Sequence, residues 1–327
     1  MKKLIALLVL AAMLLSGVSV FAEESKTTVA VIYSSTIDDK GWSQAMHDGI
    51  VNALNQGVAI EYTYIENVAT TDASATLEQL AGEYDVIIAH GSQYPNAVTE
   101  VAEDYPDQIF VVGTSDKILG DNIFTYMPQS EETGYLNGIA SALISGEGKV
   151  GVVGSANMGD AYRYARGFVL GYRKVYPDAT EYPVVAWTGS FNDIAGAGDL
   201  AETMINSGCD VLTGPSQQAV GALSKVAAAS DQGVLWTAQS LSQMADYPEV
   251  TVCAADYEYS AVIVGILERM SEGVRGGVCI PMNYSNNGFV FEFGALATEE
   301  VISTVNEALE FLRANPESID YNSVNLD

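Results

Sequence analysis

Short apolar runs recur along this chain, and longer stretches with the periodicity of amphipathic helices separate them. Runs at 28–33 and 109–113 are examples of the first kind, and 44–54 and 219–229 are examples of the second. A continuous apolar run is typical of a strand that is buried on both faces, and such strands alternate with helices in parallel sheets. The pattern therefore predicts an α/β protein whose parallel sheets are doubly wound, with helices on both faces.

The second half of the chain repeats the pattern of the first half. The stretch Asp85-Val-Ile-Ile-Ala-His-Gly-Ser-Gln93 returns in outline as Asp210-Val-Leu-Thr-Gly-Pro-Ser-Gln217, and a helical stretch and another apolar run follow each copy. Two similar halves predict two similar lobes. We expect lobe one to comprise 23–125 plus 238–277, lobe two to comprise 126–237 plus 278–327, and hinge crossings to lie near 124–127, 236–239 and 273–281.

Residues 1–22 have the features of a signal peptide. Two lysines precede an apolar run over 4–15, and small residues end the segment at Ala22. The run is shorter than the roughly 20 residues that span a bilayer, which disfavours a retained anchor. No cysteine precedes Cys209, so no lipoprotein attachment is expected. The sequence predicts an exported, soluble chain, periplasmic or secreted, after cleavage near Ala22.

Charge and composition narrow the possible functions. The chain has 14 Lys and Arg residues against 42 Asp and Glu residues, a formal net charge of −28 that argues against nucleic acid as a partner. Cys209, Cys253 and Cys279 are too far apart to form a disulfide framework or a zinc site. Only His47 and His90 are present, without metal-ligand spacing, and no Gly-x-Ser-x-Gly elbow occurs. We therefore expect no metal, no cofactor and no catalysis.

The segments that follow the apolar runs indicate where a ligand would bind. In open α/β sheets ligands lie beyond the carboxyl ends of the strands, so two facing lobes would place the site between them. These segments are rich in Gly, Ser, Thr, Gln and Asn and poor in Lys and Arg, which suits a neutral ligand. Arg163 and Arg166 follow one of the runs, and we expect them to be exposed on a helix. The segments are 33–42, 90–93, 113–116, 155–160, 189–193, 213–217, 239–243 and 256–259.

Several of these segments resemble a known family. Ile37-Asp-Asp-Lys-Gly-Trp-Ser43, with His47-Asp-Gly49 in the next helix, is similar to the N-terminal signature of the basic membrane protein family. This family comprises substrate-binding components of ABC transporters and includes purine nucleoside receptors. The resemblance continues in order through 85–95, 134–138, 187–193 and 210–213 and covers nearly all of the chain after the signal peptide. It implies a type I periplasmic-binding-protein fold with a hinge and an interlobe cleft. A purine ligand, permease and ATPase partners and a monomer are also implied.

The resemblance also implies roles for individual residues. An aromatic residue at the Trp42 position stacks on one face of a purine, and one at the Phe191 position covers the other face. Such a sandwich suits a flat heterocycle, although Trp42 could instead pack beneath its lobe. Trp187 and Trp236 lie inside apolar runs, so we expect them in the core. The expected ligand-binding residues are Trp42, Ser43, Tyr33, His90, Gly91, Ser92, Gln93, Thr114, Phe191, Gln239 and Asp256.

Some positions depart from the nucleoside receptors. Those receptors have Phe-Asn where Trp42-Ser43 stands, an acidic motif in place of Ser240-Leu-Ser-Gln243, and an aspartate near Tyr33. Carboxylates hold vicinal ribose hydroxyls better than hydroxyl side chains do. The tryptophan version resembles the branch that binds free bases, so a purine base is favoured over a nucleoside. A sugar or signalling molecule, bound for a sensor or chemoreceptor, is the alternative.

Overall fold

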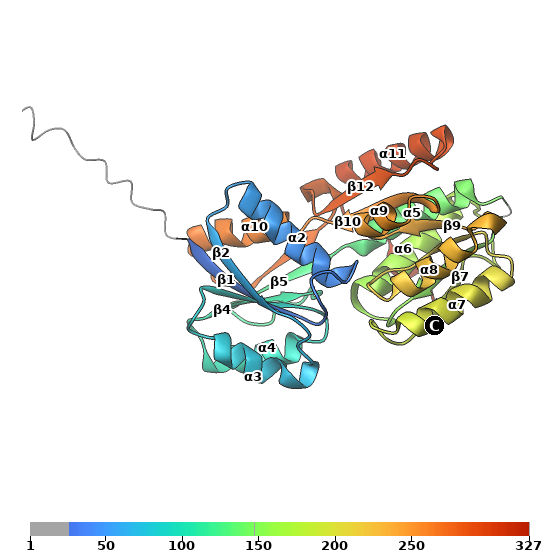
Figure 1. Ribbon diagram of the computed structural model, residues 1–327. Coiled ribbons are helices and arrows are strands. Elements are labelled where there is room, and N and C mark those ends of the chain that lie inside the picture. Colours follow the sequence, from blue (N-terminus) through green and yellow to red (C-terminus); the bar gives the residue numbers. More distant parts are fainter. Residues whose placement is uncertain (1–25, 147, 327) are drawn as a thin grey trace, which may run out of the picture.

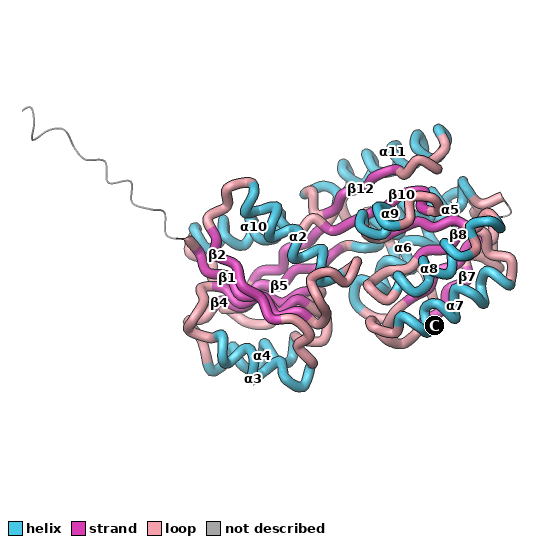
Figure 2. The backbone as a smooth tube through the Cα atoms, viewed as in Figure 1, coloured by secondary structure: helices cyan, strands magenta, loops and turns pink. Residues whose placement is uncertain are grey.

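The computed structural model describes residues 26–146 and 148–326, which form two lobes that are each built on a six-stranded sheet (Figure 1 and Figure 2). The expected signal peptide, 1–22, lies outside the described residues. Helices cover both faces of each sheet, as the alternation of apolar runs and amphipathic stretches predicts. Within the described residues, no helix is long and apolar enough to cross a membrane.

Lobe one has a fully parallel sheet with the strand order β11-β5-β4-β3-β1-β2. Alternate residues of β1 face opposite sides: Val29 and Val31 pack toward α2 and α10, while Ala30 and Ile32 pack toward α3 and α4. The sheet is therefore buried on both faces. Its elements are β1 (Thr27–Tyr33), α2 (Trp42–Asn55), β2 (Ile60–Ile65), η1 (Thr70–Asp72), α3 (Ala73–Leu80), β3 (Val86–His90), α4 (Pro95–Asp104), β4 (Ile109–Gly113), β5 (Ile123–Pro128), α10 (Ser260–Ser271) and β11 (Val278–Met282).

Lobe two has the order β12-β10-β9-β8-β6-β7, in which β12 alone runs antiparallel, against β10. Helices α7 and α8 cover one face and α5 and α6 cover the other, with α11 packed on α5. The elements are α5 (Ser130–Ile144), β6 (Val150–Gly154), α6 (Gly159–Val175), β7 (Val184–Trp187), α7 (Ile194–Asn206), β8 (Val211–Thr213), α8 (Ala219–Ala228), η2 (Ser230–Gln232), β9 (Leu235–Ala238), α9 (Leu241–Asp246), β10 (Thr251–Tyr257), η3 (Tyr284–Asn286), β12 (Phe289–Phe293), α11 (Glu299–Ala314) and η4 (Tyr321–Ser323).

The two sheets share one strand order, which confirms the prediction of two similar α/β lobes from the internal repeat. They differ at the last strand, because β11 is parallel to its neighbour and β12 is antiparallel. The Asp85–Gln93 and Asp210–Gln217 stretches both form the third strand of their sheets, β3 and β8, with the loops that follow. Equivalent loops of the two lobes therefore arise from equivalent positions of the repeat.

The expected lobe boundaries need correction. The segment 238–277, assigned to lobe one, contains β10, which pairs with β9 and β12 in the sheet of lobe two. The segment 278–327, assigned to lobe two, begins with β11, which pairs with β5 in lobe one. The chain crosses between lobes after β5, after β10 and after β11, so the crossings expected near 236–239 and 273–281 are misplaced. Strand pairing decides these assignments, between consecutive strands for β10 and over a long sequence separation for β11, and the local apolar pattern does not specify which strands pair.

Helices α5 and α6 pack with their backbones in close contact. A Cβ atom added at Gly134 or Gly138 of α5 would lie 2.1 or 2.2 Å from a carbonyl oxygen of α6. The same construction at Gly167 or Gly171 of α6 gives 2.0 Å to carbonyl oxygens of α5. Only glycine fits at these positions, so this pair forms a tightly packed support beside the interlobe crossing that precedes α5.

Two arginines that sequence analysis placed on the surface are buried at this helix pair. Arg163 of α6 donates two hydrogen bonds, of 2.6 and 2.7 Å, to the carboxylate of Glu131 at the start of α5. Arg163 is only 9% exposed and Arg166 only 6%. A bidentate contact compensates the lost hydration of both charges, which explains why Arg163 is tolerated in the interior.

Candidate ligand-binding cleft

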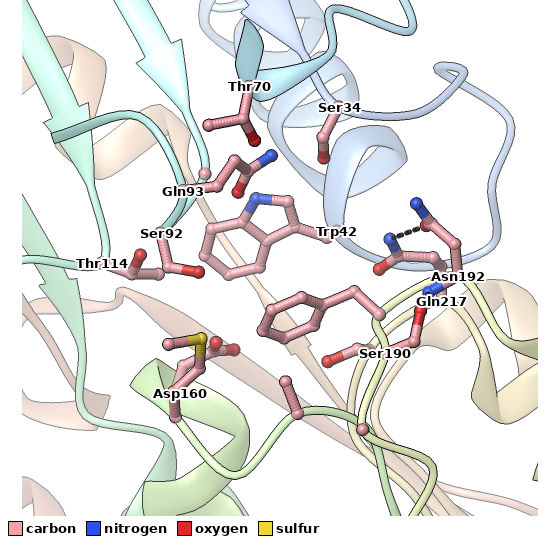
Figure 3. A pocket seen from close by; sticks show the side chains of 16 residues that line it. Ser34, Trp42, Thr70, Ser92, Gln93, Thr114, Asp160, Ser190, Asn192 and Gln217 are labelled. Atoms are coloured by element: carbon pink, nitrogen blue, oxygen red, sulfur yellow. Dashed lines mark hydrogen bonds between the residues drawn. The ribbon is translucent and has the colours of Figure 1, made fainter. Parts of the chain in front are cut away.

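A cavity of about 390 Å³ lies between the lobes (Figure 3). Its lining residues lie in the loops that follow the strands, or in the first turns of the next helices, at the carboxyl ends of the two sheets. This is the position at which α/β proteins bind ligands. The size suits a small molecule. Lobe one contributes Ser34, Trp42, Thr70, Gly91, Ser92, Gln93 and Thr114, and lobe two contributes Ala156, Met158, Asp160, Gly189, Ser190, Phe191, Asn192, Ser216 and Gln217.

Trp42 is the aromatic residue of lobe one in this cavity. It begins α2 and is 8% exposed, so it belongs to the core and lines the cleft at the same time. Its ring stacks on His90, with centroids 4.4 Å apart and planes at 12°, and Tyr257 and Tyr259 meet it edge-on. The indole Nε1 donates to the carbonyl oxygen of His90 at 3.3 Å. These contacts hold the indole in one orientation before any ligand arrives.

His90 supports Trp42 and does not line the cavity, contrary to the expected ligand contact. Its Nε2 lies 2.9 Å from the carbonyl oxygen of Trp42, which can only accept, so Nε2 carries the hydrogen. Nδ1 is then free to accept from the Tyr126 hydroxyl at 2.5 Å. Complete burial lowers the pKa of His90 to about 3. The imidazole is therefore neutral at physiological pH and donates to the backbone of Trp42, while the Trp42 indole donates to the backbone of His90.

Phe191 is the aromatic residue of lobe two in the cavity. It lies in the loop between β7 and α7, is half-buried, and lines the same space as Trp42. Gly189, at a φ of 79°, turns this loop, and Asp193 ends it by accepting from the Gly196 amide at 2.9 Å as the N-cap of α7. The adjacent Asn192 accepts a hydrogen bond from Gln217 at 2.8 Å, which joins two loops of lobe two (Figure 3).

Asp160 also lines the cavity, although the sequence singled out only the segment 155–160 that contains it. It opens the first turn of α6, lines the cavity and is 4% exposed. The Tyr257 hydroxyl donates to its Oδ2 at 2.6 Å, and Gln239 Nε2 donates to the Tyr257 hydroxyl oxygen at 2.8 Å. Burial raises the pKa of Asp160, and these hydrogen bonds and the amides at the start of α6 oppose that rise. The strand-end position was the available signal.

The other expected residues divide into two groups. Gly91, Ser92, Gln93 and Thr114 line the cavity with Trp42 and Phe191. Tyr33, Ser43, His90, Gln239 and Asp256 are absent from its described lining. Tyr33 and Ser43 are fully buried, because the carboxyl end of β1 and the first turn of α2 both pack into lobe one. Gln239 acts on Asp160 through Tyr257.

Asp256 has a structural role in this arrangement. Its carboxylate accepts from the backbone amides of Leu241 at 2.7 Å and Tyr257 at 2.8 Å, which ties the start of α9 to β10. Burial raises its pKa to about 7. Asp256 faces a second cavity of about 360 Å³ between α2, α9 and β12, separate from the one lined by Trp42. Asp256 therefore does not line the first cavity, contrary to the expectation.

The lobes touch at the rim of the cleft. Lys40 of lobe one forms a 2.9 Å ion pair with Asp246 of α9, and Gln243 donates to the Lys40 carbonyl oxygen at 3.3 Å. A Cβ atom added to Gly41 would lie 2.9 Å from the Cα of Gln217, so the two backbones are in contact there. The described conformation is thus one in which the lobes meet across the cleft mouth.

The cavity is suited to holding a neutral molecule. Among its described lining residues there is no lysine or arginine, one carboxylate, and many hydroxyl and amide groups. In the described part of the chain no three His, Cys, Asp or Glu residues form a metal-binding group. His90 is buried beneath Trp42, and His47 is hydrogen-bonded to Tyr62, so neither histidine is paired with a hydroxyl of the cavity. This chemistry supports recognition by hydrogen bonds and aromatic contact.

Two doubly wound lobes that enclose such a cleft define a type I periplasmic-binding fold, the architecture of a class of substrate-binding proteins. The chain belongs to the basic membrane protein family, described as PnrA-like ABC transporter substrate-binding proteins, whose model matches residues 26–277. This match confirms the resemblance seen in the Asp-Lys-Gly-Trp stretch and the ordered segments that follow it.

Individual relatives are named for different ligands. The chain is 31% identical over 255 residues to the putative ABC transporter glucose-binding protein of Haloferax volcanii, covering 77% of this chain and 63% of that protein, which is less than two thirds. It is 27% identical over 256 residues to a purine-binding protein of Brucella abortus, covering 76% and 70%. A solved solute-binding protein from Conexibacter woesei matches with a TM-score of 0.69 at 19% identity, covering 92% and 98%, and supports the fold alone.

Proposed function

We propose that this chain is the extracytoplasmic solute-binding component of an ABC importer and that it binds a purine base between Trp42 and Phe191. One observation carries the ligand assignment: an aromatic residue from each lobe lines the same cavity. A flat heterocycle offers two π-faces to such a pair, and the hydroxyl and amide groups around it can pair with the polar edge. The name of the Brucella abortus relative supports the same ligand class.

A free base fits the lining better than a nucleoside. Ribose hydroxyls are well held by carboxylates, and Asp160 is the one carboxylate among the described lining residues. The segment Ser240–Gln243 lies in and before α9, where Ser240 bonds to Ser242 and Gln243 bonds to Trp236 and Lys40. Asp256 is engaged by backbone amides. These groups already form hydrogen bonds within the protein, so few remain to bind a ribose attached to the base.

A neutral sugar is the second candidate, bound for transport or for a sensor or chemoreceptor. The Haloferax volcanii relative is named as a putative glucose-binding protein. Asp160, Asn192 and Gln217 supply oxygen and nitrogen groups of the kind that pair with sugar hydroxyls, and Trp42 could serve as a stacking platform. This candidate uses the same cavity, so one ligand panel distinguishes it from a purine.

The remaining parts of the proposal concern the state and partners of the chain. We propose cleavage near Ala22 to give an exported, soluble monomer, which hands its ligand to permease and ATPase subunits, carries no cofactor, catalyses no reaction and binds no nucleic acid. The family assignment and the net charge of −28 support this description. Intact mass and sedimentation of the exported protein test it, and a lipid-modified, full-length or dimeric species would contradict it.

The ligand assignment is tested by calorimetric titration. The protein is first unfolded and refolded to remove any ligand that co-purifies with it. The panel contains adenine, guanine, hypoxanthine, their nucleosides and glucose. We expect saturable binding of at least one purine base, tighter than its nucleoside, and no binding of glucose. Binding of glucose alone would replace the purine proposal by the sugar one. Conversion of inosine to hypoxanthine by the protein would contradict the non-catalytic assignment.

A further inference from the structure

Asp160 brings a carboxylate into a cavity whose other described polar lining groups are neutral. It projects from the first turn of α6 on the lobe-two side, while Trp42 lies on the lobe-one side (Figure 3). Only 4% of Asp160 is exposed, so the protein holds it in a nearly dry position. A buried carboxylate is stabilised by hydrogen-bond donors, and because Asp160 lines the cavity it can accept from a bound ligand as well as from the protein.

The hydrogen-bond network around Asp160 has a fixed direction. The Gln239 side-chain nitrogen can only donate, so the Tyr257 oxygen accepts from it at 2.8 Å. The Tyr257 hydrogen is then directed to Asp160 Oδ2, at 2.6 Å. The amides at the start of α6 also donate to this carboxylate. Every protein group that bonds Asp160 is thus a donor, and this arrangement maintains the carboxylate as an acceptor.

Among the described residues, no lysine or arginine pairs with Asp160. Arg163, one turn further along α6, is bound through two hydrogen bonds to Glu131. Lys40, at the rim, is paired with Asp246. The described lining contains no lysine or arginine. A ligand that bonds to Asp160 therefore does so through its own hydrogen-bond donors.

We propose that Asp160 determines specificity by accepting from adjacent N–H groups on the edge of the bound base. This inference rests on the proposed purine function. A carboxylate has two oxygens that match two neighbouring donors, as in N1–H and the 2-amino group of a 2-amino-6-oxopurine. Adenine places an unprotonated ring nitrogen beside its amino group, so one carboxylate oxygen would face a lone pair. The cleft is therefore selective for guanine over adenine, with hypoxanthine between them because it offers one such donor.

The test is calorimetric titration of guanine, hypoxanthine, adenine and guanosine into the wild-type protein and Asp160→Asn. We expect the wild type to prefer guanine over adenine by roughly 5- to 150-fold, the discrimination typical of one two-point contact. Asp160→Asn replaces one acceptor by a donor, so guanine affinity should fall by a similar factor. Adenine affinity should hold or rise, because an amide matches a donor–acceptor edge.

Two further variants separate recognition from structure. Tyr257→Phe removes the hydroxyl that positions Asp160 and keeps the ring that packs against Trp42 and Tyr259, so it should reduce the guanine-to-adenine ratio by less than Asp160→Asn does. Asp231→Asn makes the same charge change at an exposed position in η2 and should leave the ratio unchanged.

The outcomes distinguish the inference from the function on which it rests. If the wild type binds purines without preferring guanine, or if Asp160→Asn weakens all purines equally, the specificity role of Asp160 is wrong and the purine function stands. If only guanosine weakens, the carboxylate holds ribose, and the inference is again wrong. If no purine binds the wild type, both the function and the inference fall. The wild-type preference keeps the test decisive even if Asp160→Asn does not fold.

Discussion

The two walls of the cleft are built in different ways although the two sheets share one strand order. The lobe-one wall is part of the core: Trp42 is 8% exposed, and His90, Tyr126 and Tyr259 behind it are fully buried. The lobe-two wall is made largely of loops, in which Phe191 is half-buried and Asn192 exposed. One lobe thus presents a packed aromatic surface to the cavity, and the other presents loops.

The internal repeat explains both the similarity and the difference between the two walls of the cleft. The copied stretches end in Ser92-Gln93 and Ser216-Gln217, and all four residues line the cavity from opposite lobes. The copies diverge just before this pair, where lobe one has His90. His90 is the residue on which Trp42 stacks, so this divergence creates the supported indole that lobe two lacks. Shared loops supply hydrogen bonds, and unshared residues set the shape of each wall.

Trp42→Ala should have the largest effect, because it removes both core and ligand contacts. Truncation of a buried tryptophan typically costs about 3–5 kcal/mol of unfolding free energy, and the loss of one stacking face costs roughly 5- to 150-fold in affinity. Denaturant unfolding and calorimetry measure the two effects. A variant with wild-type stability would show that the lobe-one wall is not part of the core.

Phe191→Ala should affect affinity but not stability. Its side chain is half-buried in a loop, so we expect the free energy of unfolding to change by less than about 1 kcal/mol, while purine affinity falls roughly 5- to 150-fold. The same two measurements apply. Equal stability losses in Phe191→Ala and Trp42→Ala would erase the difference between the walls, and unchanged affinity would remove Phe191 from the site.

His90 should make the lobe-one wall sensitive to acid. Its pKa is about 3 in the fold and about 6.5 in an unfolded chain. Because the folded pKa is depressed, its contribution to stability is present above pH 6.5 and is lost as the pH falls toward 3. The difference in unfolding free energy between wild type and His90→Gln should shrink by on the order of 1–2 kcal/mol from pH 6.5 to 5. Parallel pH profiles of the two proteins would contradict a neutral, buried His90.

Lys40→Ala should have the smallest effect, since it removes a rim contact between the walls. The Lys40 and Asp246 side chains are 41% and 46% exposed, so the pair is screened by solvent and is worth about 0–1 kcal/mol. We expect ligand affinity to fall by less than about 5-fold, and the difference from wild type to vanish at 1 M salt. A large, salt-independent loss would show that this contact belongs to the binding site itself.

The sequence predicted the repeated α/β lobes, and most of the lobe-one loop residues that it nominated line the interlobe cavity, because strand ends and apolar periodicity are local signals. It misplaced β10, which pairs with the preceding strand β9 in lobe two, and β11, which pairs with β5 far back in the chain. It also predicted that Asp256 and His90 contact the ligand. A polar residue at the end of an apolar run gives the same sequence pattern whether its side chain faces a cavity or bonds to the backbone. Asp160 was not singled out for the same reason.

The proposed function requires a purine between Trp42 and Phe191, and a crystal structure of the protein grown with guanine would show whether it lies there. We predict the ring in the interlobe cavity, with one face toward each aromatic side chain and an N–H edge within hydrogen-bonding distance of Asp160. Guanine bound elsewhere, for example in the cavity beside Asp256, or a ring that contacts neither Trp42 nor Phe191, would contradict this binding mode.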